Sequence, residues 1–162
     1  MYKELIDSAE KATEELILSA EERIGVKFSN SFKEFCLNYD GAKLSDAEIL
    51  AKNSNTGQSS NAIREFLGIK KMGTLEIEYW NDDHIAFAED SFGNFFVFKK
   101  SRMDEVYFLD HETDQVDLVS NNFEEFLKNI IKADFSDLPD AKNSQVWIDP
   151  DFLKQQKDLG NA

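Results

Sequence analysis

Carboxylates, histidines and a cysteine are the residues of this chain that could support catalysis or metal binding. The densest group comprises Asp110, His111, Glu112, Asp114 and Asp117. The spacing Asp110-x-Glu112-x-Asp114 begins like a calcium loop, but such a loop requires glycine where this chain has Gln115, and a bidentate glutamate at its twelfth position. We therefore predict a polar hairpin tip and no metal site. Acid–base catalysis by these carboxylates is the third-ranked hypothesis for function.

A nucleophilic cysteine–histidine pair is conceivable, because the chain has one cysteine, Cys36, and two histidines, His84 and His111. Cys36, however, lies on the apolar stripe of a predicted helix, which is typical of a buried, inert thiol. No glycine-rich loop leads into a helix with a Lys-Ser or Lys-Thr pair, so nucleotide hydrolysis has no support. We predict no enzymatic activity and no cofactor.

Negative charge is concentrated in one stretch of the chain. The segment from Met72 to Leu127 holds fourteen acids and only three bases, Lys99, Lys100 and Arg102, and so carries eleven of the fourteen net negative charges. Because mutual repulsion destabilises a compact state, this concentration favours a basic partner. A well-solvated surface is the alternative explanation. Nucleic acid is disfavoured as a direct ligand, since phosphate contacts need clustered lysine and arginine.

Aromatic residues interrupt the acids in one part of this segment. An aromatic side chain with charged residues around it is typical of the hot spots of protein interfaces. The predicted partner-binding residues are Glu76, Glu78, Tyr79, Trp80, Asp82 and Asp83, with Asp104 and Glu105 as a second choice. The alternation of Leu75, Ile77 and Tyr79 leaves open a strand that buries these three side chains and exposes only the acids.

Length and composition predict one folded domain. A chain of 162 residues buries something like 70% of its unfolded surface, which suffices for one core. The hydrophobic share of 41% excludes a disordered acidic tail. No apolar run approaches the roughly 18 residues that cross a bilayer, the N-terminal segment does not open like a signal peptide, and a single cysteine agrees with a reducing compartment. We expect a cytoplasmic protein that contacts no membrane.

Helical periodicity dominates the start of the chain. Apolar residues at three- and four-residue steps predict one long amphipathic helix over residues 2–23, ended by Gly25, with Leu5, Leu16 and Ile17 on its buried face.

Ser31 and Glu34 have the capping-box spacing that predicts a second helix, and Gly41 fits its left-handed stop. Residues 44–50 fit a further short helix, and the polar residues 53–61 fit an exposed loop or a partner-contact loop.

From Ala62 the apolar period shortens to two, as in strands. The predicted strands are residues 62–69, 84–89, 94–99, 105–110 and 115–119. Turn residues such as 90–93 separate them, as in antiparallel hairpins, and the runs 94–99 and 105–110 are apolar on both faces, as in strands covered on both sides.

A closing helix is predicted from Asn122, which has Glu125 at the capping distance, and its apolar stripe extends to Ile131. Residues 133–162 form a less regular extension, with Pro150 placed to open a last short helix. The predicted fold class is α+β in a single domain: N-terminal helices first, an antiparallel sheet of about five strands with helices packed against it, and a closing helix.

The joints of this pattern resemble the signature of the SUKH superfamily. The matching motifs are Ile24-Gly25 with the helix start at 31–35 and the turn at 38–41, the hairpin at 85–94, the strand at 106–112 and the closing helix at 122–127. They cover residues 17–132 in the order of the family. Ser29 stands where a proline is usual, and Asp40-Gly41-Ala42 replaces an Asn-Gly-Gly turn.

This resemblance implies an α+β fold without enzymatic activity, with residues 1–162 as one SUKH-like domain and 133–162 as its C-terminal extension. Bacterial members include immunity proteins that neutralise polymorphic toxins, often nucleases, and fungal relatives regulate cell-wall synthesis. A nuclease site is basic, so the resemblance implies an immunity protein that binds a cognate toxin through its acidic surface. A non-enzymatic regulatory or scaffold protein that binds another intracellular partner is the alternative.

Overall fold

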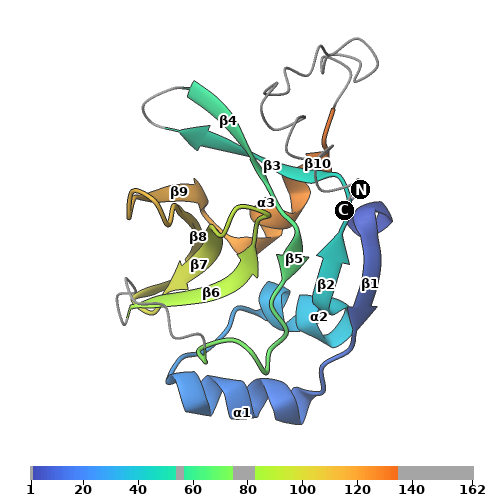
Figure 1. The fold of residues 1–162 in the computed structure, drawn as a ribbon. Coiled ribbons are helices and arrows are strands. Elements are labelled where there is room, and N and C mark those ends of the chain that lie inside the picture. The colour runs from blue at the N-terminus through green and yellow to red at the C-terminus, as the bar shows by residue number, and fades with distance from the viewer. Residues whose placement is uncertain (1, 54–56, 75–82, 135–162) are drawn as a thin grey trace, which may run out of the picture.

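Antiparallel strands are the main secondary structure of the described residues, and two helices pack against one face of the larger sheet (Figure 1). The computed structural model describes residues 2–53, 57–74 and 83–134. The larger sheet has seven strands in the order β1 (Ile6–Glu10), β2 (Asp40–Leu44), β5 (Glu65–Phe66), β6 (His84–Glu89), β7 (Phe95–Lys99), β8 (Arg102–Leu109) and β9 (Val116–Ser120). A three-stranded sheet consists of β10 (Ile130–Lys132), β3 (Ala47–Asn53) and β4 (Gly57–Ala62). The helices are α1 (Glu14–Ile24), α2 (Asn30–Tyr39) and α3 (Phe123–Lys128), preceded by the 3₁₀ helix η1 (Tyr2–Leu5).

The predicted α+β fold in a single domain is therefore confirmed, with more strands than expected. The hairpin strands β6, β7, β8 and β9 fall close to their predicted positions, because alternating apolar residues and local turn residues specify them. No helix of the described residues is long and apolar enough to span a bilayer.

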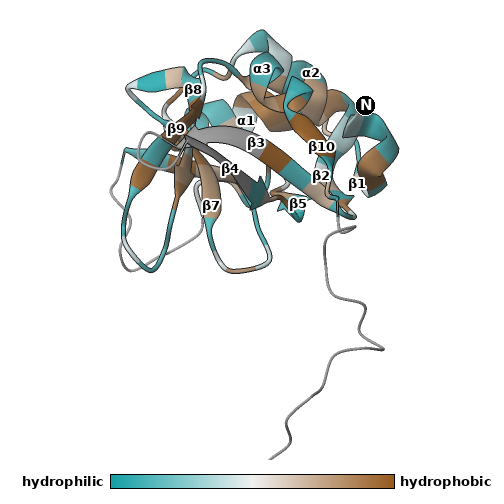
Figure 2. Cartoon of the chain, turned by 90° about the horizontal axis from the view of Figure 1, so that it is seen from above, coloured by the Kyte–Doolittle hydropathy of each residue, from teal (hydrophilic) through white to brown (hydrophobic). Residues whose placement is uncertain are grey.

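Phenylalanine rings join the helices to the sheet. Phe32 of α2 lies 5.1 Å from Phe98 of β7 and 5.0 Å from Phe123 of α3, measured between ring centroids, and both pairs are edge-on. Phe87 of β6 is 5.4 Å from Phe126 of α3, also edge-on. Aromatic rings in this geometry attract each other beyond the area they bury. Figure 2 shows the hydrophobic residues gathered where α2 and α3 face the strands.

The central strand β7 is covered on both faces, as predicted. Phe96, Val97 and Phe98 are consecutive and therefore point to opposite faces, yet each is at most 1% exposed. On β8, Val106 and Tyr107 are likewise buried. The sheet thus has no solvent-facing side at its centre.

The long helix predicted over residues 2–23 is wrong in its first half. Residues 2–5 form the 3₁₀ helix η1 and residues 6–10 form β1, which pairs with β2, so the α-helix of this segment is α1 alone. Thr13 starts α1 by accepting a hydrogen bond from the Leu16 amide, and Gly25 ends it in the left-handed region at φ 77°, as expected. Strand pairing with a distant segment outweighs the local helical period.

The N-cap of the second helix lies two residues earlier than predicted. The side chain of Ser29, not of Ser31, accepts the hydrogen bond from the Phe32 amide at 3.3 Å. Gly41 is left-handed at φ 62°, but it lies within β2, and the residue that follows the helix is Asp40 in an extended conformation.

Three further predictions are corrected by the smaller sheet. Residues 44–50 are not helical, because β3 and β4 pair as an antiparallel hairpin. The described residues of the predicted loop 53–61, which are 53 and 57–61, belong to these two strands. Ile130 and Ile131 leave the predicted closing helix after Asn129 and pair with β3. Of the predicted strand 62–69 only β5 and the end of β4 are extended. The helix predicted at Pro150 lies outside the described residues.

A buried carboxylate ties α1 to the chain that follows it. Glu21 is 1% exposed, and its Oε1 accepts hydrogen bonds from the Phe28 amide at 2.9 Å and from Lys33 Nζ at 2.7 Å. Its Oε2 accepts from Lys27 Nζ at 2.8 Å. Burial alone would raise the pKa of Glu21, but the hydrogen bonds from Lys27, Lys33 and the Phe28 amide outweigh it and lower the pKa to about 2.

Adjacent residues of α1 provide a matched test of its buried face. Ile17 is 3% exposed, whereas Leu18 is 52% exposed, and Leu16 is only half-buried in contrast to its expected burial. Ile17→Ala should lower the free energy of unfolding by about 2–5 kcal/mol. Leu18→Ala should stay within about 0.5 kcal/mol of wild type. Urea unfolding of both variants measures this, and equal effects would contradict the burial assignment.

Glu21 should make stability depend on acid pH. Because its pKa falls from 4.5 to about 2 on folding, its contribution is complete above pH 4.5 and is lost as the pH falls toward 2. We expect Glu21→Gln to lower the free energy of unfolding by roughly 3 kcal/mol at pH 7, and the exposed control Glu22→Gln to have little effect. If the difference in unfolding free energy between wild type and Glu21→Gln were the same at pH 2 as at pH 7, Glu21 would not be the source of this pH dependence.

Candidate functional site

Most of the predicted partner-binding residues lie outside the described part of the chain: Glu76, Glu78, Tyr79, Trp80 and Asp82. The other three, Asp83, Asp104 and Glu105, are described, and they lie near the turn that joins β7 to β8. The structure therefore brings these three to one end of the sheet.

Asp83 closes the β7–β8 turn. Its Oδ1 accepts a hydrogen bond from the Ser101 amide at 3.1 Å and its Oδ2 from the Ser101 hydroxyl at 3.0 Å, while its carbonyl accepts from the Lys100 amide at 2.7 Å. A side chain engaged in this way has a structural role in the turn. Its carboxylate is only partly available to a partner.

Glu105 is also engaged within the protein. It accepts a hydrogen bond from the Tyr107 hydroxyl and forms an ion pair with Arg102 at 3.0 Å. The hydrogen bond from Tyr107, followed by the contacts with Arg102, lowers the pKa of Glu105. Asp104 beside it is exposed.

The three bases of the acidic segment lie at this same end of the sheet. Lys99 and Lys100 end β7 and enter the turn, and Arg102 begins β8. Among the described residues, the acids and bases at the β7–β8 turn therefore largely offset each other. The predicted second-choice site, Asp104 with Glu105, is less negative than its sequence indicates.

The opposite end of these strands has two turns with acids and no bases, next to the ion pair of Arg64 with Glu89. It is formed by the β6–β7 turn, residues 90–94, and the β8–β9 turn, residues 110–115, which we call the acidic tip. Neither turn contains lysine or arginine. Asp104 lies in β8 and Asp110 directly follows this strand, six positions later, which corresponds to roughly 20 Å of extended chain. The acidic tip is thus well separated from the predicted residues near the β7–β8 turn.

Side-chain hydrogen bonds fix the β6–β7 turn and join it to its neighbour. Asp90 is buried, and its Oδ1 accepts from the amides of Phe92 at 2.7 Å and Asn94 at 2.9 Å. Asn94 Oδ1 accepts from the His111 amide at 3.1 Å and lies 2.8 Å from His111 Nδ1. The two turns therefore form one unit.

The β8–β9 turn contains the acid cluster that resembles a calcium loop. Asp110 Oδ1 accepts hydrogen bonds from the amides of Glu112 at 2.8 Å and Thr113 at 3.0 Å, and Asp114 adopts a left-handed φ of 57°. Burial would raise the pKa of Asp110, but the bonds from Thr113 and Glu112 lower it on balance. The predicted hairpin tip is confirmed here. In the described ranges, no three or more His, Cys, Asp or Glu residues are grouped as a metal site would need.

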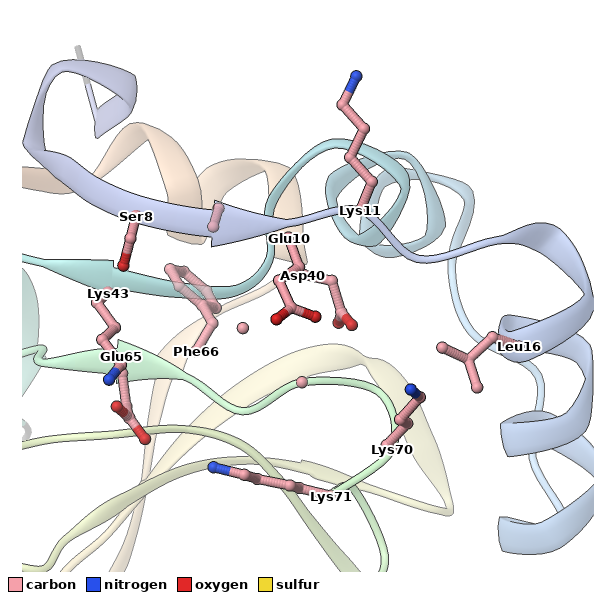
Figure 3. A pocket seen from close by; sticks show the side chains of 13 residues that line it. Ser8, Glu10, Lys11, Leu16, Asp40, Lys43, Glu65, Phe66, Lys70 and Lys71 are labelled. Atoms are coloured by element: carbon pink, nitrogen blue, oxygen red, sulfur yellow. The ribbon is translucent and has the colours of Figure 1, made fainter.

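A groove of about 450 Å³ opens on another part of the sheet, between β1, β2, β5 and residues 68–71 (Figure 3). Asp40 and Glu10 point into it side by side. Four lysines also line it: Lys11, Lys43, Lys70 and Lys71. The carboxylates could accept a cationic group, but the lysines oppose its approach.

Asp40 gives this groove its most perturbed group. It is 7% exposed, and its Oδ1 accepts from the Ile69 amide at 2.8 Å. Burial raises its pKa, the Ile69 hydrogen bond partly offsets this, and the neighbouring charge of Glu10 raises it further. Sequence reasoning identified Asp40 only as part of a turn, since its burial depends on residues 68–69, which are distant in the chain.

The histidines and the cysteine occupy separate environments. Cys36 is 2% exposed, and its burial, followed by the nearby charge of Asp40, raises the pKa of its thiol. His111 is held by Asn94 at the acidic tip, whereas His84 begins β6, where burial and then Lys99 lower its pKa. A protonated, buried thiol is a poor nucleophile, so this geometry fits the predicted inert cysteine.

Asp110→Ala tests whether the acid cluster serves the turn or a metal. Because it leaves two amides without their acceptor, the variant should lose about 1–2 kcal/mol of unfolding free energy. The loss should be the same in calcium, in magnesium, in zinc and in EDTA, as measured by thermal unfolding. A rise of several degrees in the wild-type melting temperature with one of these metals, abolished by Asp110→Ala, would establish a metal site instead.

Comparison with known proteins identifies the family. No curated protein matches the chain. The family model of the SMI1 / KNR4 family (SUKH-1) matches residues 11–129, which include α1, α2, α3 and the strands from β2 to β9. This match spans well over half of the chain and nearly coincides with the region, residues 17–132, in which the SUKH motifs occur. The chain belongs to the SMI1 / KNR4 family (SUKH-1).

Proposed function

We propose that this protein is an immunity protein that binds and neutralises a cognate polymorphic toxin through its acidic surface. Membership of the SUKH-1 family is consistent with this role. The observation that carries the proposal is the unbalanced negative charge of residues 72–127, which leaves an acidic tip without lysine or arginine. A toxin that cleaves nucleic acid needs a basic site for phosphates, and an acidic protein surface competes for such a site.

The proposed mechanism is occlusion and not catalysis. The described chemistry-bearing groups have structural roles: the Cys36 thiol is buried, Asp110 accepts the hydrogen bonds of its own turn, and Asp83 closes the β7–β8 turn. Charge complementarity would raise the rate of association with the toxin. Truncating a side chain that contacts the toxin would mainly raise the rate of dissociation. The protein would act in the cytoplasm, where it meets the toxin before secretion or after entry.

Residues 76–82 stay the proposed contact segment, and the acidic tip, at the opposite end of the strands from Asp83, is the acidic surface proposed among the described residues. Of the predicted residues, Asp83 is the least suited to a charge-removal test, because its substitution would also open the β7–β8 turn. The test therefore uses Glu76, Glu78 and Asp82.

The experiment measures binding to the toxin domain encoded beside this chain. The triple variant Glu76→Gln, Glu78→Gln and Asp82→Asn should slow association several-fold and flatten its dependence on salt, because steering acts on the association rate. Its melting temperature should be equal to or higher than that of wild type, since removing like charges relieves repulsion.

A control removes the same charge elsewhere: Glu4→Gln, Glu15→Gln and Glu22→Gln on exposed N-terminal positions. The control should retain most of the wild-type association rate. Equal slowing in both variants would show that only net charge matters. An unchanged rate in the first variant would reject the electrostatic mechanism, and a wild-type protein that neither binds the toxin domain nor protects cells producing it would reject the immunity function.

A further inference from the structure

One phenylalanine stands apart from the core. Phe92 is 73% exposed at the β6–β7 turn, whereas the other large hydrophobic residues that the described structure exposes are Leu18 at 52% and Leu118 at 44%. Phe92 is flanked by Ser91 and Gly93, in a turn where a polar residue would serve the fold equally well. Its ring therefore contributes little to the folded core.

The Phe92 backbone is held in place. The Phe92 amide donates to Asp90 Oδ1 at 2.7 Å, and Gly93 adopts φ 92°, a conformation that side chains other than glycine rarely take. A Cβ at Gly93 would lie 3.6 Å from the His111 ring, so the two turns approach closely at this point. Because the turn is ordered before binding, presenting the ring to a partner costs little conformational entropy.

Two exposed acids lie on the turn that adjoins the turn of Phe92. Glu112 and Asp114 are exposed on the adjoining turn, which Asn94 joins to the turn of Phe92 through His111. Arg64, which precedes β5, forms an ion pair with Glu89 at the end of β6. The surface thus combines one large exposed apolar side chain with two exposed carboxylates, Glu112 and Asp114, and large aromatic side chains are common anchors of interface hot spots.

We propose that Phe92 is the apolar anchor of the acidic tip, and that it inserts into an apolar pocket rimmed with lysine or arginine on the toxin domain. This inference rests on the proposed function and names the part of the surface that makes the central contact. Charge complementarity selects this partner, since the exposed carboxylates of Glu112 and Asp114 would meet the basic rim as the ring enters the pocket.

The test compares Phe92→Ala with Leu18→Ala, a truncation of similar exposure on α1. Both variants should keep the wild-type melting temperature. Against the toxin domain, Phe92→Ala should dissociate at least about tenfold faster with its association rate nearly unchanged, and Leu18→Ala should match wild type. The charge variant Glu112→Gln with Asp114→Asn should instead slow association and reduce its salt dependence. Phe92→Leu should recover part of the lost affinity.

Each other outcome overturns a defined part of the proposal. If wild type binds the toxin domain and Phe92→Ala dissociates at the wild-type rate, Phe92 is not the anchor, but the proposed immunity function is not contradicted. Wild type that does not bind the toxin domain rejects both. A melting temperature lowered by several degrees in Phe92→Ala shows that the ring serves the fold and so rejects the anchor.

Discussion

The edge-on packing of phenylalanines between α2, α3 and the central strands is the interaction on which the rest of the structure depends. Phe32 contacts rings on β6, on β7 and on α3, so it fixes both helices on one face of the sheet. The strands that this packing holds end in turns that bury few apolar side chains of their own. Rigid strands with polar turns at their ends are a common way to present binding residues, because the scaffold removes the cost of ordering them.

The excess of acids is partly structural. Glu21 is neutralised by two lysines, while Asp83, Asp90 and Asp110 accept hydrogen bonds from the turns that they close. Carboxylates used in this way add to the net charge without forming a binding surface. The negative charge that is available to a partner is therefore smaller and more localised than the composition suggests. Among the described residues it is most evident at the acidic tip, where the turns lack lysine and arginine. The groove lies on a different part of the sheet, where its lysines nearly balance its acids.

The hairpins of the second half could be predicted because their information is local: alternating residues specify the strands, and Asp90, Gly93 and Asn122 specify a turn or a cap. The strands β1, β3 and β4 could not be predicted. β1 and β3 pair with strands that are distant in the chain, and β4 lacks the alternating apolar pattern that would identify a strand. The same limit applies to the site. The roles of Asp83 and Asp40 arise from contacts with Ser101 and Ile69, and Phe92 resembles a core residue until its exposure is known. Its position between turn residues was the one local signal that could have identified it.

Binding through the acidic tip is the central claim. Amide hydrogen exchange of the wild-type chain, alone and with its toxin domain, tests this claim most directly. The account predicts that the toxin slows exchange in residues 90–94 and 110–115, and that α1 and the strands lining the groove, β1 and β2, exchange at their free rates. Slowed exchange confined to α1, β1 and β2, with both turns of the acidic tip unchanged, would contradict it.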